Sequence, residues 1–254
     1  MILSQQYREH GPILAVAASQ FESTCGLIAV ATKTTLIIDR LSNGVFKPVI
    51  RYQVGQSISH ISWSPQSQPD APVLAASFHD GSIRLFSDSV TIVAAAGGAW
   101  ISSICMDCNH GNTLASLSSN KKCLVWTLAD GQTEPHEIQL PSNGRCVQYH
   151  EKLAEHILIG CENGDVRLRD LVTKTWIFSI YIPTSGLLRG MSWNPDDPNI
   201  FGVAVDESWN IWNISNGSNS SSKMHGEGAA DFKYFGTNSG FVIPPRDLLR
   251  FIRC

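Results

Sequence analysis

A spacing of about 43 residues recurs along this chain and limits its possible folds more than any other feature. An apolar run ending in a large side chain returns at separations of 43, 43, 44 and 41 residues, at Trp63, Met106, Tyr149, Trp193 and Tyr234. Self-similarity with a period of about 20 to 50 residues is typical of solenoids, propellers and repeat arrays. We therefore expect structural copies that stack on one another.

A second pattern repeats in step with the first. Each copy has an apolar run, a polar turn and an alternating run, with Asp80, Asn120, Asn163 and Asp206 in the turns. Asp and Asn side chains bond the nearby backbone and tolerate left-handed dihedrals, which suits tight turns. The flanking runs alternate or are solidly apolar, which favours strands over helices.

Together these patterns predict an all-β fold, a WD-repeat β-propeller with one four-stranded blade per copy. We count five full blades, the first a faint copy at residues 25–38 preceded by a strand at 13–17, and an incomplete sixth from residue 229. Pro244 and Pro245 then interrupt the pattern, because proline cannot donate to a sheet ladder. We expect one propeller domain over 1–243, an irregular tail over 244–254, and a chain truncated relative to a closed ring.

Composition narrows the class of protein. The chain has 254 residues, 43% of them hydrophobic, and a net charge of −3, so it can bury a core but offers no basic face for nucleic acid. Residues 1–10 lack the features of a secretory signal, and no apolar run is long enough to cross a membrane. Seven scattered cysteines indicate reduced thiols, hence cytosol or nucleus. The Ser-rich stretch 213–222 reads as a flexible connection between blades.

Two arrangements superficially suggest metal chemistry. Cys105 and Cys108 form a C-x-x-C near His110 and Cys123. Residues three apart in a strand point to opposite faces, and no matching second pair occurs, so we interpret them as packed strand residues.

The second arrangement is His150-Glu151 followed by His156. A zinc-protease helix needs two histidines four apart, and these are six apart, so we expect a solvated turn between two strands. The sequence also has no phosphate-binding glycine loop and no nucleophile elbow. We therefore expect no enzymatic activity, no metal and no cofactor.

The segment at residues 80–86, DGSIRLF, looks like the end of a WD repeat with Phe86 in the tryptophan position, which Trp126 and Trp212 fill in later copies. Several segments in order resemble the small propeller nucleoporin of the Y-shaped outer-ring complex of the nuclear pore; they lie at residues 61–65, 83–88, around 126, 162–171 and 210–215. The histidine usual in WD repeats is missing, so we expect stability to rest more on apolar packing than on a polar network.

The resemblance implies a scaffold subunit of the Y complex that docks on a larger propeller–solenoid nucleoporin. It further implies localisation at the nuclear pore, roles in pore assembly and in protein and mRNA transport, and kinetochore attachment in mitosis. It implies no direct nucleic-acid contact, membrane insertion or small-molecule substrate. The alternatives are a general WD-repeat adaptor, such as a ubiquitin-ligase substrate receptor, and a propeller enzyme. The adaptor usually carries extra docking segments, and the enzyme needs polar groups converging on the channel.

Three groups of residues are candidates for partner binding. Arg84 and Arg167 share one repeat position, where the simpler interpretation is a surface ion pair between blades. Trp176 and Phe178 alternate in an outer strand and either pack between blades or anchor a partner. The start of the sixth copy presents an aromatic edge at Phe232, Tyr234 and Phe235, which a partner would complete or cover.

Overall fold

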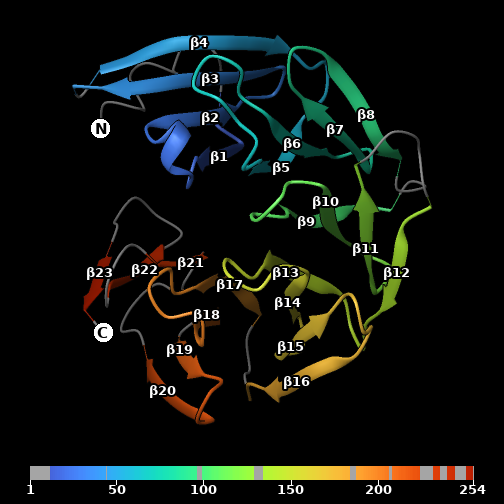
Figure 1. Ribbon diagram of the computed structural model, residues 1–254, viewed down its shortest axis with the longest axis vertical. Helices are drawn as coiled ribbons and strands as arrows, with labels where there is room; N and C mark the ends of the chain where they lie inside the picture. The colour runs from blue at the N-terminus through green and yellow to red at the C-terminus, as the bar shows by residue number, and fades with distance from the viewer. Residues whose placement is uncertain are drawn as a thin grey trace. The chain divides into compact units, whose positions relative to one another are not determined.

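The computed structural model describes residues 12–43, 45–95, 99–128, 134–183, 187–205, 208–223, 231–234, 239–243 and 250–253. Its described residues form strands and loops, with one 3-10 turn, η2 (Glu22–Thr24). Six sheets follow one another along the chain, each pairing its strands in chain order (Figure 1). Five of these sheets have four strands and the sixth has three, so the predicted WD-type propeller, with five full blades and an incomplete sixth, is confirmed.

The first three sheets are built as follows: β1 (Ala15–Ala18), β2 (Leu27–Ala31), β3 (Thr35–Ser42) and β4 (Val45–Gln53); β5 (Ile58–Trp63), β6 (Leu74–Phe78), β7 (Ser82–Phe86) and β8 (Val90–Ala95); β9 (Ile101–Met106), β10 (Thr113–Ser118), β11 (Lys122–Thr127) and β12 (His136–Gln139).

The last three are these: β13 (Gly144–Tyr149), β14 (His156–Cys161), β15 (Asp165–Asp170) and β16 (Trp176–Tyr181); β17 (Leu188–Trp193), β18 (Ile200–Val205), β19 (Ser208–Asn213) and β20 (Ser218–Lys223); β21 (Asp231–Tyr234), β22 (Ser239–Ile243) and β23 (Arg250–Arg253).

Position within a sheet explains which runs are solidly apolar and which alternate. The second strand of each full blade is buried along nearly its whole length, as in β6, where all five residues are buried. Such a strand has covered faces on both sides, which requires a continuous apolar run. The outermost strand β16 alternates half-buried and exposed residues, because only one of its faces is covered.

The polar turn column adopts the expected geometry at Asp80 and at Asn163, whose Oδ1 accepts the Asp165 backbone N–H at 3.2 Å; Asp206 lies outside the described residues. Asp80 Oδ1 accepts a hydrogen bond from the Ser82 backbone N–H at 2.9 Å, and Gly81 between them has φ +83°. In the next copy Lys121 takes this left-handed position with φ 60°, although a side chain is unfavourable there. Glycine is therefore not required at the left-handed position of this turn.

The chain forms two compact units, each with its own core. The N-terminal unit is Met1–Ser119 with Leu124–His136, and the C-terminal unit is Asn120–Cys123 with Glu137–Cys254. In the N-terminal unit β1 packs beside β5, and β5 beside β9; in the C-terminal unit β13 packs beside β17, and β17 beside β21. Trp63 and Phe86 anchor the first core, and Trp193 and Phe201 the second.

Two segments differ from the sequence-based expectation. Residues 213–222, expected to be a flexible connection, form a turn followed by the outer strand β20. The side chains of Asn213 and Asn216 each accept the backbone N–H two residues on, at 2.9 Å, and Gly217 has φ +68°. The tail expected to be irregular contains β23, which pairs with β22. Ladder hydrogen bonds come from the backbone, so polar serines and a short run after a double proline can both form strands.

Candidate partner-binding surfaces

Arg84 and Arg167 are both engaged within their own units. Arg84, in β7, donates from Nη1 to the carbonyl oxygen of Val54 at 3.3 Å, and its guanidinium lies 4.1 Å from the centre of the Phe78 ring. Arg167, in β15, lies 3.5 Å from a carboxylate oxygen of Asp165 on the same strand. The ion pair of Arg167 is therefore within one blade, not between blades, and a role of either arginine in partner binding stays a prediction.

Phe178 packs between two blades of the C-terminal unit. Its ring stacks on Phe201 of β18, with 5.9 Å between centroids and 13° between planes. Trp176 lies instead beneath the guanidinium groups of Arg167 and Arg169, at 5.6 and 4.9 Å. Both aromatic side chains thus have intramolecular partners, which supports the packing interpretation for Phe178 most directly.

The other face of the same strand is the exposed one. Ile177 is 49% exposed and Tyr181 is 59% exposed, while Trp176, Phe178 and Ile180 are half-buried. Trp176 and Phe178, which the sequence predicts either to pack between blades or to anchor a partner, lie on the half-buried face. The signal for the exposed face was the same alternation, since residues 177, 179 and 181 must point the opposite way.

The aromatic edge of the sixth copy is described only in part. Phe232 and Tyr234 lie in β21, which pairs with β22, but the structure describes only their backbone. Phe235 lies outside the described residues. Their role in partner binding stays a prediction.

A column of polar side chains, which no sequence pattern indicated, caps the loops after the first strand in four of the blades. Ser64, Asp107, His150 and Asn194 each directly follow a repeat aromatic or methionine, and all four are buried. Asp107 accepts the backbone N–H groups two and three residues on at 2.9 and 3.2 Å, and Asn194 does so at 2.9 and 3.3 Å. Ser64 accepts one such group at 3.1 Å. Four chemically different residues therefore satisfy the same backbone donors.

His150 fills this position with a ring nitrogen, so the expectation of a solvated turn was wrong for this residue. Nδ1 accepts the backbone N–H groups of Lys152 and Leu153 at 3.0 and 2.9 Å, and Nε2 lies 2.8 Å from the carbonyl oxygen of Pro198. The ring centre is 4.4 Å from that of Trp193 in the next blade. An Nδ1 that accepts two hydrogen bonds carries no proton, so Nε2 carries it and donates to Pro198.

The neutral form of His150 is required by these contacts and favoured by its surroundings. Burial is the main cause that lowers the pKa of His150 below its ordinary value of 6.5, and the charges of His156 and Lys152 lower it further. The hydrogen bond to Pro198 acts in the opposite direction. His150 is thus a structural bridge between two blades rather than a general base or a metal ligand.

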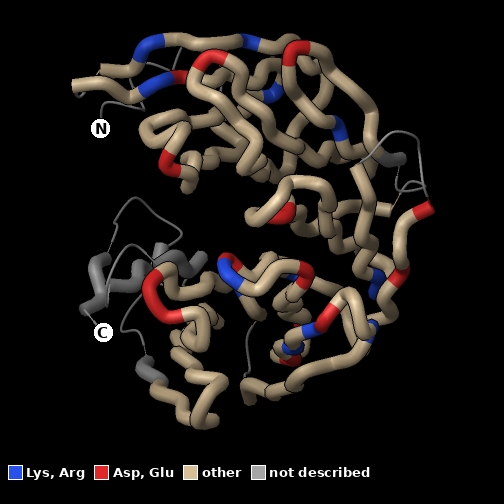
Figure 2. Tube along the Cα trace, in the orientation of Figure 1, with Lys and Arg blue, Asp and Glu red and all other residues tan. Residues whose placement is uncertain are grey.

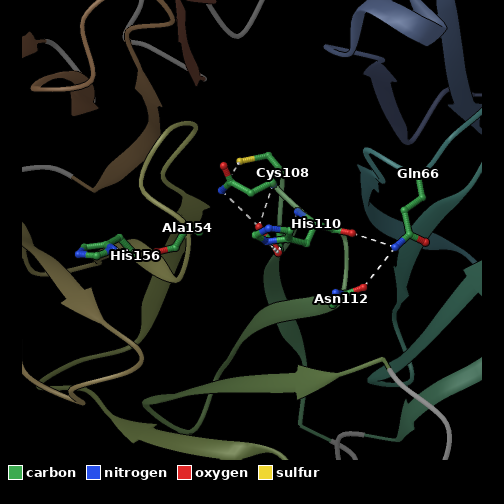
Figure 3. A network of polar contacts seen from close by, with 8 residues as sticks. Gln66, Cys108, His110, Asn112, Ala154 and His156 are labelled. Atoms are coloured by element: carbon green, nitrogen blue, oxygen red, sulfur yellow. Dashed lines mark hydrogen bonds and ion pairs between the residues drawn. The ribbon is translucent and has the colours of Figure 1, made fainter.

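The N-terminal unit joins its blades through different groups. Trp63 Nε1 donates to the carbonyl oxygen of Ala17 in the preceding blade at 2.9 Å. The exposed side chain of Gln66 donates to the carbonyl oxygen of His110 at 2.8 Å and to Asn112 Oδ1 at 3.2 Å in the following blade (Figure 3). Because the usual WD histidine is missing, we expected apolar packing to hold the blades together. These polar contacts between blades supplement that packing.

The cysteines are placed as packed or loop residues. Cys105 lies in β9 and Cys108 in the loop after it, where Asn109 approaches its sulfur at 3.8 Å. Burial raises the pKa of Cys123 to about 12 and that of Cys161 to about 11, so both thiols are protonated and unreactive at neutral pH. In the described part of the chain, no three His, Cys, Asp or Glu side chains are gathered so that they could hold a metal ion.

A small hollow lies between two blades of the N-terminal unit. Its volume is about 120 Å³, and its lining includes Ser64, Gln66, Leu85, Met106 and Asn112. Sites for small organic ligands usually measure roughly 300 Å³ or more. Charged residues of both signs are scattered over each unit (Figure 2), and no helix in the described ranges is long and apolar enough to cross a membrane.

Comparison with known proteins agrees with the blade architecture. No protein-family model matches the chain. It is 26% identical to Nucleoporin Nup37 of Mus musculus over 175 residues, which cover 65% of this chain and 53% of the mouse protein. It is also 26% identical to Nucleoporin Nup37 of Homo sapiens over 144 residues, 53% of this chain and 44% of the human protein. The chain thus matches about half the length of these relatives. With its WD-type blades, it is a propeller protein that is similar to Nucleoporin Nup37 of two mammals, in line with the resemblance in its sequence.

Proposed function

We propose that the chain is a non-enzymatic scaffold subunit of the outer-ring Y complex of the nuclear pore. The similarity to Nucleoporin Nup37 in two mammals is the observation that carries this proposal. In this role the blades dock on a larger propeller–solenoid nucleoporin and support pore assembly and nucleocytoplasmic transport. Kinetochore attachment in mitosis would follow from membership of the same complex.

The chemistry of the described residues supports a framework role. Among the groups whose pKa is shifted by burial, His150, Cys123 and Cys161 are set among backbone and core contacts. His150 bonds three backbone groups, which leaves neither ring nitrogen available to a substrate. Such fixed contacts are those expected of a rigid surface that partners bind.

Affinity capture from nuclear extract with mass spectrometry tests this function. We expect a tagged chain to recover the outer-ring nucleoporins together and in near-equal amounts. A tagged WD-repeat adaptor of a ubiquitin ligase serves as the control for unspecific propeller binding. Recovery of ubiquitin-ligase subunits without nucleoporins would contradict the proposal and favour the adaptor alternative.

A further inference from the structure

The outermost strands of the blades differ in how they are protected against pairing with another chain. An exposed sheet edge is a template for added strands, and charged residues, proline and bulges usually block it. In the N-terminal unit, β4 carries Lys47, Pro48 and Arg51, and a register shift interrupts its pairing with β3. In the C-terminal unit, β16 reads WIFSIY, six residues without charge or proline (Figure 2), and the register shift in its pairing with β15 lies between Leu168 and Arg169, so the pairing is uninterrupted from Phe178 to Tyr181. The strand β8, VTIVAA, also lacks charge and proline, but the register shift in its pairing with β7 falls inside the strand, between Ile83 and Arg84.

The pairing of β15 with β16 shows which backbone groups point to the open edge. Ile182 donates its N–H to the carbonyl oxygen of Gly164 at 3.0 Å, and the register continues with Tyr181 opposite Asp165 and Ser179 opposite Arg167. In an antiparallel pair, hydrogen-bonded and non-hydrogen-bonded residues alternate. Ser179 and Tyr181 therefore direct both their N–H and C=O groups away from β15. In the described part of the chain β16 is the last strand of its sheet.

The side chains beside these backbone groups suit the same contact. Ile177 and Tyr181 are 49% and 59% exposed on the face that Ser179 shares. Tyrosine is among the residues that contribute most to protein interfaces, because it buries a large ring and keeps a hydrogen-bonding group. Extended peptides that add to a sheet edge gain affinity from main-chain bonds and specificity from alternate side chains.

The geometry points to β16 as the docking edge for an extended segment of a partner protein, which adds as a fifth strand to this blade. The segment pairs with the backbone of Ser179 and Tyr181 and places an apolar residue beside the exposed side chains of Ile177 and Tyr181. The occupant is an extended chain, because the N–H and C=O groups of Ser179 and Tyr181 lie in line along the edge. Main-chain groups of another strand repeat at the same spacing and can pair with all four. This inference rests on the proposed scaffold function and assigns it a surface.

Hydrogen exchange and binding to the larger propeller–solenoid nucleoporin of the outer ring test the inference together. We expect amide exchange in residues 176–181 to slow at least about tenfold in the complex. Ser179→Pro removes an N–H that takes no part in the β15 ladder, so the blade should fold while the affinity falls at least about tenfold. The double change Ile177→Lys with Tyr181→Lys should weaken binding similarly without altering the backbone.

The double change Leu41→Lys with Val45→Lys is the matched control, because these side chains are 42% and 58% exposed beside the protected edge of β4. It should bind as the unchanged chain does. Equal affinity of all variants, with unchanged exchange at 176–181, would overturn the edge assignment while leaving the scaffold function intact. Failure of the unchanged chain to form the complex would instead contradict the scaffold function. Sedimentation as a dimer that Ser179→Pro dissolves would overturn the partner assignment in favour of a second copy.

Discussion

Blade junctions of the two units, with the same repeat pattern, are held by different chemistry. In the N-terminal unit, Trp63 donates to Ala17 and the exposed Gln66 reaches two acceptors of the next blade. In the C-terminal unit, His150 is buried, bonds Pro198 and lies against the ring of Trp193. Trp63 and Trp193 occupy the same repeat position, yet no described residue accepts from Trp193 Nε1. The repeat thus fixes where a junction forms. Single residues decide how well the junction tolerates substitutions and how strongly its stability depends on pH.

The largest difference between the junctions should come from removing the loop caps. His150→Ala leaves two backbone N–H groups and the Pro198 carbonyl unbonded and opens space beside Trp193, so we expect the free energy of unfolding to fall by about 3 kcal/mol. Ser64→Ala, the matched change in the N-terminal unit, removes one hydrogen bond and should cost about 1 kcal/mol. Urea unfolding of both variants measures the difference, and equal losses would show that His150 is only a loop cap.

The losses of unfolding free energy on replacing the two tryptophans should differ by the contribution of one hydrogen bond. Phenylalanine at either position loses similar ring volume, but Trp63→Phe also leaves the carbonyl of Ala17 without its donor. We expect Trp63→Phe to cost about 1 kcal/mol more than Trp193→Phe. Thermal and urea unfolding of the pair check this, and a greater loss for Trp193→Phe would place the dominant contact in the tilted ring contact with His150.

Acid should weaken the C-terminal junction selectively. The folded-state pKa of His150 is lowered, so the unfolded chain takes up a proton more readily as the pH falls through about 6.5. The stabilisation by neutral His150 is fully present above that pH and declines below it, toward the folded-state pKa. His150→Asn keeps an oxygen acceptor like that of Asn194 and cannot be protonated. Its unfolding free energy should change less between about pH 7 and pH 5 than that of the unchanged chain; an equally steep profile would assign the acid sensitivity elsewhere.

The smallest effect is expected at Gln66. Its side chain is exposed, so water replaces the bonds to His110 and Asn112 when Gln66→Ala removes them. We expect a loss of about 0.5 kcal/mol or less. A loss comparable to that of His150→Ala in the same urea titration would remove the contrast between the junction of Gln66 and that of His150.

The framework of the blades was predictable from the sequence because its signal is repeated. The large side chains at Trp63, Met106, Tyr149 and Trp193 are all buried, as their period implied, and Asp80 and Asn163 sit in the turns assigned to them. A strand needs only alternation or a solid apolar run, and several copies of the pattern reinforce one another.

The caps and junctions were not predictable for a physical reason. Ser64, Asp107, His150 and Asn194 perform one task, yet they share only the ability to accept a hydrogen bond near the backbone. A pattern search for residue type does not find such a column, and the tautomer of His150 depends on the Pro198 carbonyl 48 residues away. The strand β20 was missed likewise, because a serine run offers no apolar periodicity and pairs through its backbone alone.

Imaging of the chain in living cells tests the scaffold assignment most directly. A fluorescent tag introduced at the native gene should give a punctate signal at the nuclear rim that coincides with pore markers at super-resolution, and the signal should exchange slowly after photobleaching, as expected of a structural subunit. A uniform signal through nucleus or cytosol with fast recovery would contradict a nuclear-pore scaffold and leave the similarity to Nucleoporin Nup37 as one of fold.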